Sequence, residues 1–458
     1  MTATADVLIV GGGFSGTALT ANLLKRDPNL TVVVSKKPDG PAFGIAYQTN
    51  CPLHLLNVPA QRMSAFRDQP NHFLDWAEAN GLPIKPNQFA QRMVYRQYLN
   101  SIQEGSIQSG RVEIVTDETV KIIRESNGWR CLFASGETIL AGSVVLAFGG
   151  FPRTAVPELS YVQDLSAFVS NPWDYRPMFP GGKDEVIGFI GSGLTAVDAV
   201  LAYEAAGFTG KYVMLSRRGL LPMAHDLSTT PFPVSEVPQP NSSLRMLVHE
   251  LRLASKRAEE LGTNWRAVVD AMRPNMAKYW GALDVGERKR FLEQLRTFWE
   301  AHRHRMAHEI AAHIEQLRRE ERLKVVGFRL LAVREIPTKI FVASVHNVPN
   351  WINAVESYSF NRLINCTGPS NRVSSLPSPL IHELLSDGIA ATDELELGIV
   401  SDEHGQVIDA SGQGQRGLYV LGLLRRGQLW ESTAVPELRA QAADLSDFLV
   451  RRSGETVR

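Results

Sequence analysis

Two glycine-rich turns, each preceded by a short apolar segment, constrain the fold of this chain more than any other feature. The first is Gly11-Gly12-Gly13-Phe14-Ser15-Gly16 behind Val7–Val10, and the second is Gly191-Ser192-Gly193-Leu194-Thr195-Ala196 behind Val186–Ile190. In such a turn the first glycine permits the bend, the second leaves room for a pyrophosphate, and the third small residue lets the next helix pack on the strand. One match would be weak evidence, but two correctly flanked matches predict two dinucleotide-binding units.

The length of the chain fits this prediction, because 458 residues exceed what one hydrophobic core usually supports. We predict an α/β fold with two Rossmann-like dinucleotide-binding domains of the three-layer ββα type. The first domain takes residues 1–165 and 355–458, and the second takes 166–354. The second domain carries a helical insertion at about 240–322, where Asp284 followed by Glu287 predicts a helix start.

Composition narrows the class of partner and the location. Basic and acidic residues balance at 48 each, which removes the compositional case for nucleic acid or an anionic membrane. The three cysteines lie far apart, so the dithiol relay of thioredoxin-reductase-like enzymes is not expected. No segment approaches the roughly 18 apolar residues of a membrane span, and no signal peptide is evident, so we expect a cytoplasmic protein.

The second unit has the charge pattern of an NADPH site. Its strand Tyr212–Leu215 ends in Ser216, Arg217 and Arg218, close to where such folds contact the adenosine ribose. A guanidinium there suits the 2′-phosphate of NADP, because it is permanently charged and binds in a fork. We therefore expect NADPH on Gly191, Gly193, Leu194, Thr195 and these three residues.

The first unit is assigned to FAD by the tail of the chain. A late strand ending at Gly422, then Thr433 and a last helix to about residue 450, match the way two-dinucleotide flavoenzymes close their FAD domain. The residue that is usually an acid on the ribose is replaced by Ser35, followed by Lys36. We expect FAD on Gly11, Gly13, Phe14, Ser15, Gly16, Ser35, Lys36, Asn57, Gly422 and Thr433.

Several further motifs resemble one bacterial family. They are Gly44-Ile45-Ala46-Tyr47, His54-Leu55-Leu56-Asn57-Val58-Pro59, Asn171-Pro172-Trp173, Ser216 to Leu221, His302-Arg303-His304-Arg305-Met306, and Leu424-Arg425-Arg426-Gly427 before Trp430-Glu431-Ser432-Thr433. Together they resemble the FAD/NAD(P)-binding proteins typified by YdhS over nearly the whole chain. The resemblance implies the fold and the two cofactors more than a substrate.

Candidates for residues beside the flavin are few. His54 titrates near physiological pH and could serve as an acid or base, while Arg425, Trp430 and Glu431 are candidates to approach the ring from the tail. No metal site is expected, because His308 and His313 are five residues apart and do not share a helix face.

The predicted function is hydride transfer from NADPH to FAD, followed by oxygen activation in a monooxygenase-like reaction on a small molecule. Two alternatives stay open at this point. One is an NADPH-dependent flavoprotein reductase or dehydrogenase, and the other is a flavin-binding scaffold with little turnover.

Overall fold

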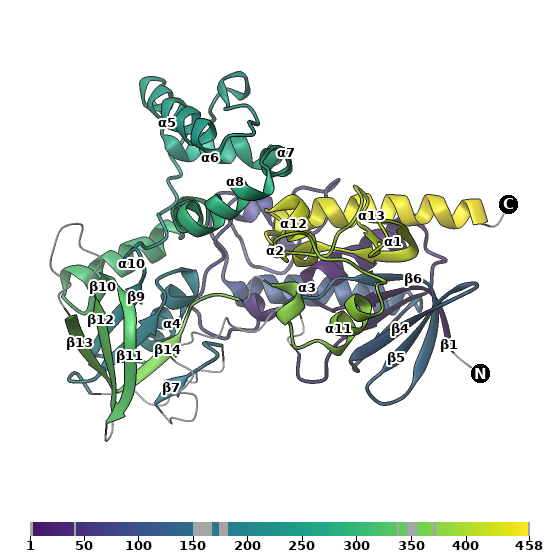
Figure 1. Cartoon of the computed structure of the whole chain (residues 1–458), viewed down its shortest axis with the longest axis horizontal. Coiled ribbons are helices and arrows are strands. Elements are labelled where there is room, and N and C mark those ends of the chain that lie inside the picture. Colours follow the sequence, from purple (N-terminus) through teal and green to yellow (C-terminus); the bar gives the residue numbers. More distant parts are fainter. Residues whose placement is uncertain are drawn as a thin grey trace.

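The computed structural model describes residues 3–40, 43–149, 167–173, 182–336, 339–345, 355–369 and 372–456. Within these ranges the chain forms two sheets of mainly parallel strands, each with helices packed on it, and a separate lobe of helices (Figure 1). The first sheet holds both the N-terminal strand and the last strand of the sequence, so distant segments meet there.

The first sheet runs in the order β15-β16-β6-β1-β2-β3, with β4 and β5 continuing from β6 as an antiparallel meander. The pairs among β16, β6, β1, β2 and β3 are parallel. The strands are β1 (Ala3–Val10), β2 (Val32–Ser35), β3 (Val112–Val115), β4 (Thr119–Glu125), β5 (Gly128–Phe133), β6 (Thr138–Leu146), β15 (Gln406–Ile408) and β16 (Gly414–Val420).

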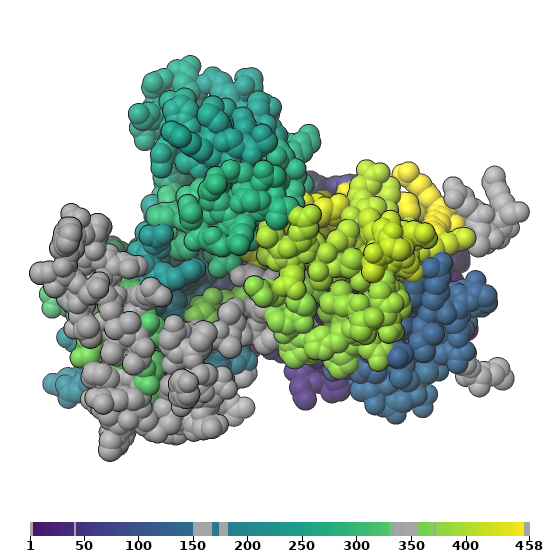
Figure 2. Space-filling view, viewed as in Figure 1, coloured from purple at the N-terminus to yellow at the C-terminus, as the bar shows by residue number. Residues whose placement is uncertain are grey.

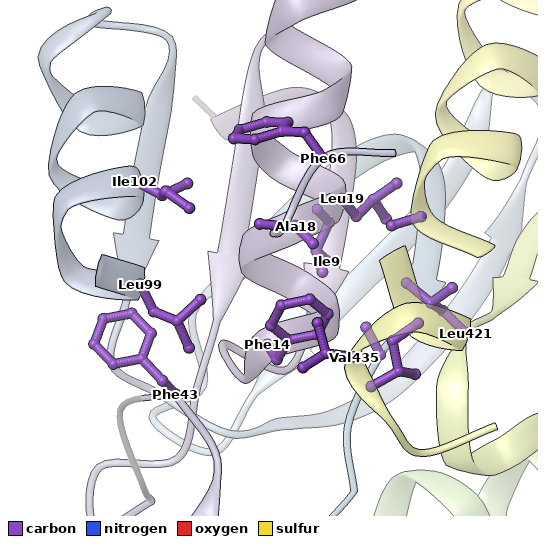
Figure 3. Close-up of a cluster of buried hydrophobic side chains, with 14 of the residues drawn as sticks. Ile9, Phe14, Ala18, Leu19, Phe43, Phe66, Leu99, Ile102, Leu421 and Val435 are labelled. Atoms are coloured by element: carbon purple, nitrogen blue, oxygen red, sulfur yellow. The ribbon is translucent and has the colours of Figure 1, made fainter. Parts of the chain in front are cut away.

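Alternate residues of β1 bury opposite faces of this sheet, as period-2 side-chain geometry requires. Val7 and Ile9 face a core formed with the helices, whereas Leu8 and Val10 face a core formed with β5 and α11. In Figure 3, α1 carries Phe14 and Leu19 between Leu99 of α3 and Val435 of α13. The helices of this unit are α1 (Phe14–Arg26), α2 (His72–Ala79), α3 (Arg92–Gln108), α11 (Pro379–Ser386), α12 (Arg426–Leu429) and α13 (Val435–Thr456).

The second sheet has the order β10-β9-β8-β14-β7, and its pairs are parallel. Helices α4 (Leu194–Ala205) and α10 (His308–Arg319) share one core with it, and the antiparallel sheet β11-β12-β13 shares another. Its strands are β7 (Phe168–Val169), β8 (Val186–Ile190), β9 (Lys211–Ser216), β10 (Leu323–Gly327), β11 (Arg329–Ile336), β12 (Lys339–Val345), β13 (Val355–Phe360) and β14 (Arg362–Asn365). Helices, parallel sheet and antiparallel sheet are the three layers that the sequence predicts.

The insertion is a helical lobe that packs against the tail of the chain (Figure 2). Its core includes Trp280 and also reaches Leu397 and Trp430 of the first unit. The predicted helix start is confirmed, since the Asp284 carboxylate accepts a 2.8 Å hydrogen bond from the Glu287 amide. The helices are α5 (Leu244–Glu260), α6 (Trp265–Met272), α7 (Met276–Ala282), α8 (Val285–Arg290), the π-helical segment Phe291–Leu295 and α9 (Arg296–Arg303).

Two expected boundaries differ from the strand pairing. Helix α10 lies inside the expected insertion, but Ile314 and Leu317 pack in the core of the second sheet, so α10 belongs to that sheet. Strand β14 lies beyond residue 355, yet Arg362 pairs with Ile187 of β8, so the chain returns to the first unit only after Asn365. We propose these limits in place of 322 and 355.

Short 3-10 segments complete the described chain at Ile45–Tyr47, Ala60–Arg62, Val234–Glu236, Arg273–Asn275, Val373–Ser375 and Gly422–Arg425. None of the helices in the described ranges has both the length and the apolar composition needed to cross a bilayer.

Candidate cofactor-binding site

The first glycine turn joins β1 to α1, and its glycines have the separate steric roles that the sequence predicts. Gly11 has φ +117°, and a β-carbon on it would lie 2.9 Å from the Ala147 carbonyl. A β-carbon on Gly16 would clash with the Gly11 carbonyl, so the helix can pack here only without a side chain. A β-carbon on Gly13 would meet nothing closer than 3.8 Å, which leaves this glycine facing space that a phosphate can use.

The start of α1 is open to an anion. Gly13 is the N-cap residue, and no side chain caps the helix. Ordinarily the first amides of a helix need an acceptor, and a phosphate can supply it. The Phe14 amide is an exception, because it donates to the Phe43 carbonyl at 3.2 Å, and the Phe14 ring is buried in the core. Phe14 therefore shapes the turn rather than contacting the ligand, which corrects the expectation for this residue.

The tail of the chain meets this turn. A β-carbon on Gly422 would lie 3.2 Å from Ser15 Oγ, so the end of β16 lies directly beside the start of α1. The Gly422 amide donates to Gln441 Oε1 of α13 at 3.1 Å. Thr433 is exposed two residues before α13 begins, next to the fully buried Ser432. The expected association of the tail with the first glycine turn is therefore present in the structure.

The second glycine turn repeats this geometry between β8 and α4. Gly191 has φ +110°, and a β-carbon there would clash with the Cys366 carbonyl at the end of β14. Within the described residues, no atom would lie within 4 Å of a β-carbon on Gly193, which caps α4 without a side-chain hydrogen bond. Leu194 and Thr195 in the first turn of α4 are half-buried. The middle glycine again faces open space, so this turn also fits a pyrophosphate.

The two basic residues after β9 are on the surface. Arg217 and Arg218 are exposed, and the Arg218 guanidinium lies 5.6 Å from the centre of the Phe298 ring. Ser216 is occupied within the turn, since its hydroxyl lies 2.8 Å from that of Ser192 and accepts from the Gly219 amide at 3.1 Å. Arg217 pairs with no carboxylate in the described ranges, so its charge is available to a ligand.

At the corresponding strand end of the first unit, Ser35 and Lys37 already have partners within the protein. Ser35 is buried, and its hydroxyl lies 2.7 Å from that of Thr119 in β4. Lys36 is half-buried, and Lys37 pairs with Glu118 at 2.7 Å. The Ser35 side chain therefore joins β2 to β4, and we propose this structural role in place of the expected contact with the ribose of FAD.

His54 is a structural link rather than a free acid or base. Its Nε2 donates to the Asp198 carbonyl at 2.7 Å, so Nδ1 is the unprotonated nitrogen and accepts from the Thr49 hydroxyl at 2.7 Å. Burial lowers the pKa of His54, which keeps the ring neutral. With both nitrogens occupied, the candidate catalytic role for His54 is not supported. Asn57 differs. Among the described residues only its backbone carbonyl has a partner, His225 Nε2 at 3.0 Å, so its side-chain amide is left for a ligand.

Arg425 also has an internal role. Its Nη2 donates to the carbonyls of Asp402 and Glu403 at 3.1 and 3.0 Å, and to Gln428 Oε1 at 2.9 Å. Burial lowers the pKa of Arg425, and only 6% of the residue is exposed. The guanidinium therefore holds the 402–405 turn, and we propose this role in place of the expected approach to the flavin.

The remaining two candidates, Trp430 and Glu431, are both buried. The Trp430 ring stacks on the Trp280 ring, with 4.7 Å between the ring centres. It also packs at right angles to the Phe291 ring, with 5.2 Å between the ring centres. Trp430 has φ +59° and ψ −61°, and the Glu431 amide donates to the Leu429 carbonyl at 2.7 Å, which is a strained γ-turn. This turn directs the chain from α12 toward α13.

The Glu431 carboxylate is held by the insertion. It accepts from Trp299 Nε1 at 3.1 Å and lies 3.1 Å from Arg303 Nη2. Burial alone would raise the pKa of Glu431, but Arg303 and its neighbours outweigh it and lower the pKa. Glu431 is therefore an anion that joins the lobe to the tail through Arg303. The Arg303 Nη2 atom also lies 3.5 Å from the Glu437 carboxylate.

Sequence reasoning missed one contact that joins the units. Arg92 of α3 and Asp198 of α4 form a buried, two-pronged ion pair, although they are 106 residues apart. Neither residue belongs to a recognisable motif, so no local signal could have paired them. Among the described residues, no three histidine, cysteine or acidic side chains come together as metal ligands.

Comparisons with known proteins agree with this layout. Residues 8–151, which include the first glycine turn, match the profile of a family described as FAD-NAD(P)-binding. No curated protein matches the chain in sequence. The family match supports the resemblance to FAD/NAD(P)-binding proteins, while the narrower YdhS-like assignment stays a prediction.

Solved structures extend the likeness over 98% of the chain. DfoA from Erwinia amylovora, a cadaverine monooxygenase bound to FAD, is 14% identical, matches over 95% of its own length and has a TM-score of 0.70. The ornithine N-hydroxylase KtzI from Kutzneria sp. 744, with FADred, NADP+ and L-orn, is 14% identical over 100% of its length, with a TM-score of 0.64. T. acidophilum thioredoxin reductase is 10% identical over 99%, with a TM-score of 0.55. At these identities the likeness shows the shared fold.

Proposed function

We propose that this chain is an FAD-dependent, NADPH-using oxidoreductase in which the first unit holds FAD and the second holds NADPH. The observation that carries the proposal is the pair of glycine turns, each with a middle glycine facing open space at the uncapped start of a helix. Such turns accommodate a pyrophosphate. The family match over residues 8–151 supports the same cofactors.

In the first unit, the free amides at the start of α1 and the space at Gly13 would hold the FAD pyrophosphate. Gly422 and the segment before α13 would approach FAD from the tail, with Asn57 offering an amide from the loop opposite. When bound, FAD would supply the redox chemistry by accepting a hydride and passing electrons onward. The protein's part is to orient the reactants and exclude water.

In the second unit, Arg217 selects NADPH over NADH. It is exposed at the carboxyl end of β9, where the adenosine ribose lies in this fold, and it has no carboxylate partner in the described chain. An unpaired guanidinium favours the additional phosphate of NADP.

Oxygen activation on a small molecule is the favoured overall reaction. Among the structures with this fold are enzymes described as N-hydroxylase and monooxygenase, which act on ornithine and cadaverine. A dithiol mechanism is disfavoured, because Cys51, Cys131 and Cys366 form no disulfide with one another and burial raises the pKa of Cys131 to about 12. Cysteines that form no disulfide also suit a cytoplasmic location.

A direct test is the absorption spectrum of the purified protein during anaerobic titration with NADPH. We expect a flavin spectrum that bleaches with NADPH far faster than with NADH, and then recovers when oxygen and an amine substrate are supplied. Recovery with stoichiometric peroxide and no product would instead favour the reductase alternative. A flavin that NADPH does not reduce would favour the scaffold alternative.

A further inference from the structure

A buried ion pair connects the two dinucleotide-binding units. Arg92 Nη1 donates to Asp198 Oδ2 at 2.7 Å and Nη2 donates to Oδ1 at 3.0 Å, so the guanidinium and carboxylate meet as two parallel forks. Each side chain is 10% exposed. A pair of this geometry holds both distance and orientation, unlike a single contact between flexible surface charges.

Both partners are themselves fastened to their own surroundings. Arg92 Nε donates to the Leu55 carbonyl at 2.9 Å, and the Arg92 amide donates to the His54 carbonyl at 2.9 Å. His54 in turn donates from Nε2 to the Asp198 carbonyl at 2.7 Å. The first unit therefore holds Asp198 at its side chain through Arg92 and at its backbone carbonyl through His54.

The two ends of this connection lie close to the two proposed cofactor sites. Asp198 is four residues after Leu194, the first residue of α4, which places it about 6 Å along the axis from the helix start that would meet the NADPH pyrophosphate. His54 and Leu55 precede Asn57, whose free amide we assign to the FAD side. The ion pair thus ties the phosphate end of one site to the loop that lines the other.

We propose that Arg92, Asp198 and His54 are positioning residues that set the approach of the second unit's nicotinamide to the first unit's flavin. This inference rests on the proposed function. The three side chains do not touch the reacting atoms in this assignment. They matter because a displacement of about 1 Å between reacting groups can cost about 10²-fold in rate.

The experiment removes both charges together, because removing one would leave the other buried and unpaired. The variant is Arg92→Met with Asp198→Asn. Its matched control is Arg257→Met with Glu236→Gln, which removes an exposed pair separated by 3.0 Å between α5 and the segment Val234–Glu236. Arg92→Lys is a milder third variant, which retains the charge but cannot form the fork.

For the double variant we expect unchanged flavin content and an NADPH dissociation constant within about threefold of wild type. The rate constant of anaerobic flavin reduction at saturating NADPH should fall 10- to 100-fold, while reduction by dithionite stays the same. Arg92→Lys should give an intermediate rate, and the control should behave as wild type.

Amide hydrogen exchange on the protein without NADPH supplies a readout independent of turnover. Exchange should accelerate in residues 51–57 and 194–205 of the double variant and not in the control. A wild-type reduction rate in the folded double variant would overturn the inference, as would an equal loss of rate with dithionite. If wild-type protein is not reduced by NADPH, the proposed function fails, and exchange still reports whether the connection is rigid.

Discussion

The two glycine turns have nearly the same backbone, yet the strands beside them end in different ways. In the first unit Ser35 is buried against Thr119 and Lys37 is paired with Glu118. In the second unit Arg217 is exposed without a described carboxylate partner. We therefore propose that the shared turn binds a pyrophosphate and that the end of the neighbouring strand discriminates between dinucleotides. Three predictions test this division, and a fourth tests the contact between His225 and Asn57.

The largest effect is expected from placing a side chain in the open space at the middle glycine of either turn. Gly13 and Gly193 have φ of −72° and −78°, which valine can adopt, so Gly13→Val and Gly193→Val should fold. Gly13→Val should lose flavin entirely, whereas Gly193→Val should stay yellow but resist reduction by NADPH. Absorbance at the flavin band and anaerobic titration measure both. A yellow Gly13→Val protein would show that the first turn is not the FAD site.

Removing the charge after β9 should have a smaller, selective effect. Arg217→Ala should raise the KM for NADPH about 10- to 100-fold, as expected for loss of a charged hydrogen bond worth about 1.5–3 kcal/mol. The KM for NADH should hardly change. Arg218→Ala is the control, because its guanidinium already lies over Phe298. Equal increases for both nucleotides would remove the phosphate assignment.

Ser35 should matter for stability and not for the cofactor. Ser35→Ala leaves the buried Thr119 hydroxyl without this partner, which costs about 1–3 kcal/mol of unfolding free energy. Urea denaturation and FAD titration of the apoprotein measure the two quantities separately. A tenfold weaker FAD affinity with unchanged stability would restore Ser35 as a ribose contact.

The smallest effect concerns pH and the contact between His225 and Asn57. Burial, assisted by Arg305, lowers the pKa of His225 to about 4 from its usual 6.5. Below pH 6.5 the unfolded chain takes up a proton that the folded chain does not, so stability is full above pH 6.5 and is lost as the pH falls toward 4. Between pH 7.5 and 6, His225→Gln should therefore lose about 1 kcal/mol less stability than wild type. Identical pH slopes in urea denaturation would refute this.

Much of the fold followed from local patterns. The segment Val186–Ile190 was predicted as a strand and is β8, and Asp284 caps a helix as its spacing to Glu287 indicates. These predictions succeed because strand burial and helix capping depend on residues that are close in the chain. The expected limits of the insertion and the return of the tail were less accurate, because α10 and β14 are assigned by what they pack against.

The site divides in the same way. The glycines could be assigned from sequence because each has a steric role within its own turn. The roles of His54 and Arg425 could not be assigned from sequence. A histidine or arginine in a loop gives the same sequence pattern whether its side chain faces a ligand or a backbone carbonyl. Only the fold shows that both ring nitrogens of His54 form hydrogen bonds, to Thr49 and Asp198, and that Arg425 holds the 402–405 turn.

By itself, the sequence determined that this chain has two glycine-rich turns of the same type and an arginine pair after the neighbouring strand of only the second, since both are local patterns of residue type and spacing. The tertiary structure alone decided how the units are joined. Arg92 meets Asp198, and Glu431 meets Arg303, because strands and helices far apart in the chain pack together. Buried charges need partners, and which partner each one finds is a property of the packed molecule.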